Sequence, residues 1–214
     1  MKKFYTIIYI TCFVIISFNI KAKEYTVKIN YGLVNHDDAA SSINNDIKYD
    51  NTDSGYIFSL SKNLNQMFDT EFIYYDLGDS TIKGENGEIF THDGGNYQFK
   101  NSGTISRNTS GLGIGGIIST PKSDFNSSAY LKIGFHHWSH SGSTDLLHGS
   151  SSTFESHYYN KGFDLYSGLG LDFTIINNVI VSLDYYYISF NDSTFGQIIG
   201  TPSTLLSLGL GLKF

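Results

Sequence analysis

The last twelve residues, 203–214, alternate between two kinds of side chain. One set is mostly large and apolar: Thr204, Leu206, Leu208, Leu210, Leu212 and Phe214. The other set is mostly small or polar: Leu205, Ser207, Gly209, Gly211 and Lys213. A period of two predicts a β-strand with one apolar face. Such strands can lie in lipid only in a closed barrel, because every backbone N–H and C=O group must be paired there.

Residues 1–22 have the pattern of a secretory leader. The segment begins with two lysines, continues as a mostly apolar run and ends at the small residue Ala22. A permanent transmembrane helix is less consistent with the sequence, since Asn19 interrupts the apolar run and Lys21 ends it. We therefore predict a signal peptide over 1–22 and one mature domain over 23–214.

The single cysteine, Cys12, lies in the predicted leader, so disulfides and thiol chemistry are not expected in the mature chain. The formal net charge of the chain is −6, and removal of the three lysines of the leader would lower it to −9. An acidic chain without clusters of basic residues argues against nucleic acid as a partner.

Period-two alternation predicts eight strands. They are residues 25–34, 55–64, 67–77, 105–118, 128–138, 161–173, 179–190 and 203–214. The connections are short near 65–66, 120–124 and 174–178, and long and polar over 35–54, 78–104, 139–160 and 191–202. Short turns at one end and long loops at the other are typical of outer-membrane barrels, whose short turns face the periplasm. We predict an all-β fold, an eight-stranded antiparallel up-and-down transmembrane β-barrel.

A soluble lipocalin-like barrel is the structural alternative, and it would place its apolar face inside. Here the face opposite the large apolar residues carries Gly, Ser, Asp, Glu and Lys, which cannot fill a soluble core of this size. The composition of the two faces therefore favours lipid against the apolar face.

Four stretches of the chain, in this order and spacing, resemble the eight-stranded OmpA-like (opacity-like) outer-membrane barrel family. They are EFIYYDLGD (71–79), YLKIGFHHW (130–138), GFDLYSGLGLDF (162–173) running into VSLDYYY (181–187), and LLSLGLGLKF (205–214). The resemblance implies the barrel fold and a location in the outer membrane of a Gram-negative bacterium. It says little about activity. Family members often carry a peptidoglycan-binding domain after the barrel; none is expected here, so cell-wall tethering is not inferred.

Three charged residues, Glu71, Lys132 and Asp184, fall on inward faces of the predicted strands. The family that the chain resembles has an acid, a lysine and an acid at matching places. The three can form a paired plug inside the barrel, or a gate whose ion pairs exchange partners to open a narrow conduit. A permanent wide channel is not expected, because the interior of eight strands is just wide enough for side chains.

Nearer the periplasmic rim, Lys28, Asp172 and Lys213 are expected to contact water. Glycines at every second position, Gly111, Gly113 and Gly115, are interpreted as space for large side chains from facing strands. A nucleotide-binding loop is not predicted there, because no helix follows.

Five histidines gather around the third long connection: His136, His137, His140, His148 and His157. Their spacing does not fix the three or four converging ligands that a zinc site needs. We predict no metal and no cofactor, and we expect solvated histidines in a loop.

A different set, His137, Ser139 and Glu155, is locally similar to outer-membrane lipid A deacylases. Such chemistry uses a serine nucleophile, a histidine base and a carboxylate that orients the histidine. Because Glu155 falls in a long loop, we predict no catalytic residue, and a lipid A-modifying enzyme stays the second alternative function.

The favoured function is a structural or adhesive one, with host or surface ligands bound by the long external loops. The first alternative is a narrow gated porin. Expected partners are outer-membrane lipid, lipopolysaccharide and the barrel-assembly machinery, for which Phe214 is interpreted as the carboxy-terminal signal. The protein is expected to be a monomer.

Overall fold

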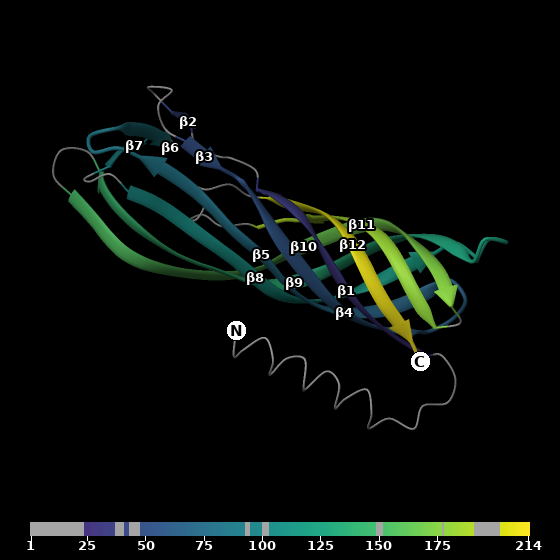
Figure 1. Ribbon diagram of the computed structural model, residues 1–214. Coiled ribbons are helices and arrows are strands. Elements are labelled where there is room, and N and C mark those ends of the chain that lie inside the picture. Colours follow the sequence, from purple (N-terminus) through teal and green to yellow (C-terminus); the bar gives the residue numbers. More distant parts are fainter. Residues whose placement is uncertain are drawn as a thin grey trace, which may run out of the picture.

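The computed structural model describes residues 24–36, 41–42, 48–92, 95–99, 103–148, 152–176, 178–190 and 202–214. The predicted leader over 1–22 and most of the fourth long connection lie outside these residues. The regular structure of the described residues consists of β-strands (Figure 1). Among the described residues, no helix has the length and apolar character needed to cross a membrane.

Eight long strands pair antiparallel with their neighbours in chain order. They are β1 (Tyr25–His36), β4 (Thr52–Asn63), β5 (Phe68–Gly84), β8 (Gly103–Ser119), β9 (Ser127–His148), β10 (Ser152–Ile176), β11 (Val179–Ile188) and β12 (Ser203–Lys213). Strand β12 also pairs with β1, from Lys213 opposite Thr26 to Ser203 opposite His36. This pairing closes the cylinder, and the predicted eight-stranded up-and-down barrel is confirmed.

Short turns join β4 to β5, β8 to β9 and β10 to β11 at one end of the barrel. In the first turn, the Asn65 side-chain oxygen accepts the backbone N–H groups of Met67 and Phe68 at 2.9 and 3.0 Å. The first and last described residues also lie at this end: Glu24 bonds to the end of β4, and Phe214 pairs with Tyr25. We call it the short-turn end.

At the opposite end, β5, β9 and β10 continue seven, ten and nine residues beyond their predicted limits, and β8 continues two. Strands β5, β8, β9 and β10 have 17, 17, 22 and 25 residues. Short strands add to them: β3 (Lys48–Asp50) pairs with β5, the hairpin of β6 (Ile89–His92) and β7 (Gly95–Phe99) pairs with β9, and β2 (Ser41–Ser42) pairs with β6. The prediction of loops over 78–104 and 139–160 is therefore wrong for most of both segments. These extensions are rich in Ser, Thr and Asn, so no apolar alternation reveals them in the sequence.

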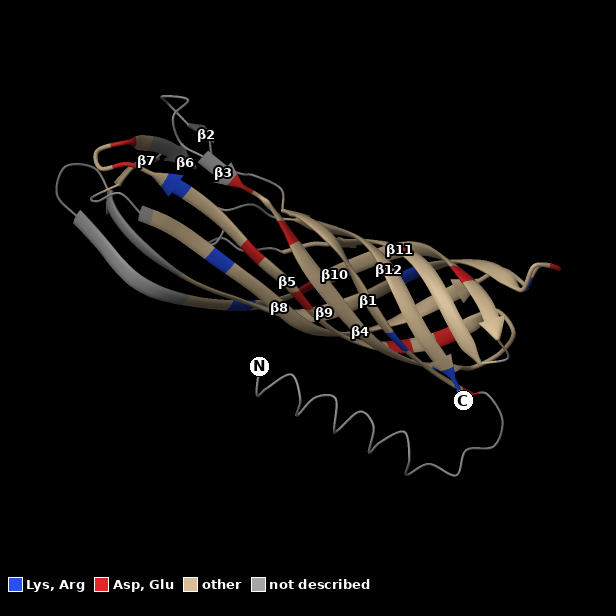
Figure 2. Ribbon diagram, in the orientation of Figure 1, with Lys and Arg blue, Asp and Glu red and all other residues tan. Residues whose placement is uncertain are grey.

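The outward face of the barrel wall is apolar. On β9, Leu131, Ile133 and Phe135 are 61, 62 and 66% exposed, and Leu206 to Leu212 of β12 alternate in the same way. Charged residues are few in the middle of the strands (Figure 2). Exposed side chains of this size form a favourable surface in lipid and an unfavourable one in water. The predicted assignment of the apolar face to the outside of the barrel is confirmed.

Inward glycines lie under large aromatic rings. A Cβ atom at any of these positions would collide with the ring above it. The pairs are Gly111 with Tyr75, Gly115 and Gly134 with Tyr166, Gly162 with Trp138, and Gly170 with Tyr130. The interpretation of the alternating glycines as space for large side chains is confirmed.

Candidate functional site

The three charged residues predicted to face inward meet inside the barrel. The Lys132 Nζ atom lies 3.3 Å from Glu71 Oε2 and 3.6 Å from Asp184 Oδ1. The residues come from β9, β5 and β11, so the closure of the barrel brings them together. All three are buried, and each carboxylate offsets part of the cost of removing the ammonium from water. We call Glu71, Lys132 and Asp184 the central charge cluster.

Three tyrosine hydroxyls complete the hydrogen bonds of this cluster. Lys132 Nζ donates to Tyr186 Oη at 2.7 Å, Tyr166 Oη donates to Glu71 Oε1 at 3.0 Å, and Tyr130 Oη donates to Asp184 Oδ1 at 2.5 Å. The Lys132 Nζ atom also lies 4.8 Å from the centre of the Tyr186 ring. A buried ion pair is stable only when its remaining polar atoms are bonded, and these contacts meet that condition.

These tyrosines fall on inward faces of the predicted strands, but they were not identified as partners of the charged residues. Their common signal is a glycine directly opposite on the paired strand: Gly134 faces Tyr166, Gly170 faces Tyr130 and Gly168 faces Tyr186. Ser182 and Asn30 also belong to the network and were not identified from the sequence. Both donate hydrogen bonds to Asp184, Ser182 at 2.6 Å.

A second ion pair extends the network toward the short-turn end. Lys28 Nζ lies 2.7 Å from Asp172 Oδ1 and donates to Tyr130 Oη at 3.1 Å. The expectation that Lys28 is solvated at the rim is wrong, because Asp172 and Tyr130 reach across from β10 and β9 and leave it 5% exposed. Asp172 itself remains partly in contact with solvent.

Beyond the central charge cluster, away from the short turns, apolar and aromatic side chains fill the barrel. We call this set the upper core: Val34, Ile57, Ile73, Tyr75, Leu77, Trp138, Tyr166, Tyr186, Ile188, Phe190 and Leu205. The prediction of an inward face made of small and charged residues is wrong for this half. The interior of eight strands is narrow enough for side chains to fill it, so apolar packing is available there as in a soluble protein.

Two of the histidines also lie inside the barrel. His136 and His140 are buried, and the expectation of solvated loop histidines is wrong for both. His136 lies on the inward face of β9, and His140 lies on the same face because β9 continues past residue 138. The Nδ1 atom of His136 lies 2.6 Å from Tyr75 Oη, and its Nε2 atom lies 2.9 Å from the carbonyl oxygen of Ser189. The His140 ring stacks on Trp138 with 4.6 Å between ring centres.

The side chains of His148 and His157 lie outside the described residues. Within the described part of the chain, no three His, Cys, Asp or Glu side chains converge as metal ligands would.

The His137, Ser139 and Glu155 set is not brought together by strand pairing. Glu155 lies opposite Asp145, six residues beyond Ser139 on β9, which is about 20 Å at the usual rise of a strand. The His137 ring packs edge-on against Phe163 with 4.7 Å between centres. The side chain of Glu155 lies outside the described residues.

The terminal residue Phe214 lies at the seam between β12 and β1. Its ring stacks on that of Tyr25 with 6.3 Å between centres, and the two residues exchange backbone hydrogen bonds of 2.9 Å in each direction. The contact fastens the chain end to the first strand. The predicted role of Phe214 in assembly stays a prediction.

Comparisons by sequence find no matching family model and no matching curated protein. Comparison by structure finds Ail, the attachment invasion locus protein of Yersinia pestis, in complex with the heparin analogue sucrose octasulfate. The two share 15% identity over 91% of this chain and 100% of that one, with a TM-score of 0.50. The outer membrane protein OprG from Pseudomonas aeruginosa shares 13% identity over 90% and 97% of the chains, with a TM-score of 0.52.

The chain has the fold of an outer-membrane β-barrel. At 13 to 15% identity, the similarity extends to the fold and not to an activity. The apolar outer wall is the surface that a barrel of this fold presents to the lipid of the outer membrane.

Proposed function

We propose that the protein is a closed outer-membrane barrel that holds a contact surface outside the cell. The observation that carries this proposal is the double closure of its interior. The central charge cluster fills one level of the barrel, and the upper core fills the level beyond it. An exchange of partners by Lys132 would therefore open the first level and leave the packed upper core in place.

The length of the strands supports a role outside the membrane. A tilted strand needs about 9 to 11 residues to cross the bilayer, and β10 has 25. The short-turn end faces the periplasm by the rule for outer-membrane barrels, so the extended strands and long connections face outward. Contact residues carried on such a rigid scaffold are well placed for recognition. The resemblance to the OmpA-like family is consistent with this proposal.

The charge of the long connections favours a neutral or basic partner. The four segments 35–54, 78–104, 139–160 and 191–202 contain twelve Asp or Glu residues and three Lys. Such a surface repels polyanions. A sulfated saccharide of the kind seen in the Ail complex is therefore not the partner that we propose, and a protein surface is.

Planar-bilayer conductance tests the closed interior. The refolded mature protein and its Lys132→Ala variant should both be silent, and a variant that also truncates Trp138 and Phe190 serves as the control for an opened interior. Discrete current steps that change with Lys132→Ala would contradict the proposal. They would support the narrow gated porin, which is favoured by the position of Lys132 between two acids.

Adhesion of whole cells tests the outer surface. Bacteria that display the protein should bind wells coated with matrix proteins more than bacteria with the empty vector do. They should not bind heparin-coated wells at physiological salt. Retention on heparin alone would contradict the proposed partner class.

A further inference from the structure

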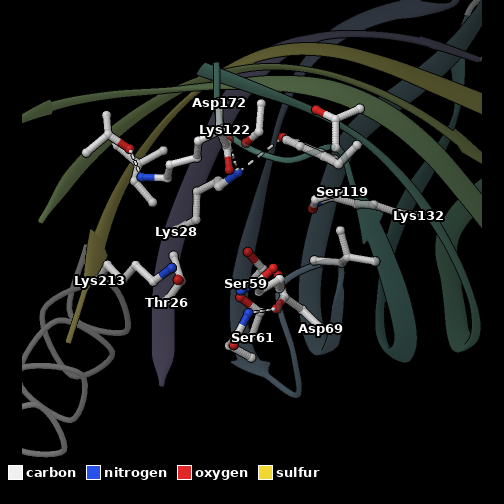
Figure 3. A pocket seen from close by; sticks show the side chains of 18 residues that line it. Thr26, Lys28, Ser59, Ser61, Asp69, Ser119, Lys122, Lys132, Asp172 and Lys213 are labelled. Atoms are coloured by element: carbon white, nitrogen blue, oxygen red, sulfur yellow. Dashed lines mark hydrogen bonds and ion pairs between the residues drawn. The ribbon is translucent and has the colours of Figure 1, made fainter. Parts of the chain in front are cut away.

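A polar cavity opens at the short-turn end of the barrel. Its volume is about 120 Å³, and about 10 to 15 Å³ is enough to hold one water molecule. Inward side chains from all eight long strands line it (Figure 3). Tyr130 and Lys132 lie among them, so the inner side of the cavity borders the central charge cluster.

The cavity concentrates cations and hydroxyl groups. Four lysines and two aspartates line it. Lys28 and Lys132 are paired with buried or partly buried acids, so the positive charge offered to a ligand comes from the rim lysines, Lys213 among them. Much of the remaining wall consists of serine and threonine hydroxyls, including those of Thr26, Ser59 and Ser61. Lysine ammonium groups and hydroxyls are donors that suit the oxygen atoms of an anion.

Both aspartates already have partners. Asp172 is paired with Lys28 at 2.7 Å, and Asp69 accepts a hydrogen bond from the Asn63 amide at 2.7 Å. Lys213 extends from the last strand toward the interior beside Thr26 (Figure 3). Its ammonium therefore adds positive charge at the mouth of the cavity.

We propose that this cavity binds the oxyanion group, a phosphate or a carboxylate, of a periplasmic molecule. Lys213 attracts the anion at the mouth, the Lys28–Asp172 ion pair forms the inner wall, and the hydroxyls of Ser59 and Ser61 donate to its oxygens. The volume admits such a group. The periplasmic location of the ligand rests on the proposed function, whereas the binding follows from the cavity itself.

Phosphate titration followed by NMR tests the site. The probe is inorganic phosphate, added at constant ionic strength to the refolded mature protein in a glucoside detergent that contributes no phosphate. The backbone amides of Ser59, Ser61 and Lys213 should shift and saturate. Lys213→Gln should weaken binding about fivefold to tenfold, because a charge-assisted contact is lost.

Lys62→Gln is the matched control. Lys62 lies at the same end of the barrel, and it is exposed over the Tyr25 ring rather than in the cavity. This variant should bind phosphate as the wild type does, and both variants should keep the heat-dependent gel shift of a folded barrel. Absence of saturable shifts, or an equal loss in both variants, would overturn the proposal.

A second titration distinguishes the source of the anion. The probe is a short peptide with a free carboxy terminus, compared with the same peptide as its amide. Binding of the acid and not of the amide, together with weaker binding of phosphate, assigns the site to a peptide carboxylate. Tighter binding of phosphate assigns it to a phosphate group. Failure of all these probes would overturn the proposal and leave the proposed closed barrel untouched.

Discussion

The ammonium of Lys132 and the carboxylate of Glu71 lie 3.3 Å apart, with side chains that are 2% and 0% exposed. Lys132→Met would leave the Glu71 and Asp184 carboxylates buried without their cation. We expect this variant to lose about 3 kcal/mol of unfolding free energy, as measured by urea titration in detergent.

The triple variant Lys132→Met, Glu71→Gln, Asp184→Asn is the control for this loss. It removes the charges together, so most of the lost stability should return. Wild-type stability in the single variant would show that Lys132 is not the counter-ion of the two acids.

Gly162 offers a test of how tightly the interior is packed. A Cβ atom there would collide with the Trp138 ring, so Gly162→Ala should cost about 1 to 3 kcal/mol. The cost should shrink in a Trp138→Leu background, measured as a double-mutant cycle. Gly116→Ala is the control, because the nearest atom to its Cβ would be the Asp69 carbonyl oxygen at 3.9 Å. Equal costs for Gly162→Ala in both backgrounds would argue against the ring contact.

The orientation of the barrel can be read by cysteine labelling. Asn86 lies in the exposed turn after β5, and Phe125 lies in the exposed turn between β8 and β9. With a membrane-impermeant maleimide on intact cells, Asn86→Cys should be labelled and Phe125→Cys should react only after lysis. The same labelling of the unaltered protein measures any background reaction at Cys12. The reverse pattern would invert the assignment of the two ends.

Variants of Phe214 and Tyr25 distinguish two roles of Phe214, as an assembly signal and as a stacking partner. Phe214→Ala should lower the amount of barrel in the outer membrane several-fold, because both the aromatic terminus and the stack are lost. Tyr25→Ala loses the stack and keeps the terminus, so its yield should stay near the wild-type value. The measurement is the heat-shifted band in membrane fractions. An equal loss in both variants would assign the effect to the stack.

The barrel wall was predictable because lipid imposes a strict rule on it. Along β9, the apolar residues Leu131, Ile133 and Phe135 must alternate with inward residues, and that period of two is visible in the sequence. The extension of β9 beyond Trp138 was not predictable in this way. Outside the lipid, a strand may carry polar residues on both faces, so His140 and Ser141 look like parts of a loop.

The interior was predictable only in part. The alternation placed Glu71, Lys132 and Asp184 on inward faces, and the structure brings them together. It did not say which side chains cross the barrel to meet them, because the partners of Asp184, including Asn30 and Tyr130, come from strands far away in the chain. The strand register determines which side chains meet, and a single sequence does not reveal the register.

The long hairpin of β9 and β10 has a mechanical consequence. The two strands stay paired from Ser152 opposite His148 to Phe173 opposite Ser127, from the outer tip down to the short-turn end. Backbone hydrogen bonds between antiparallel strands stand perpendicular to the strands, so a pull along the hairpin loads many of them at once. The force is shared by the backbone hydrogen bonds of the closed wall, so these bonds do not break one after another. A contact made by the proposed outer surface would therefore hold under tension.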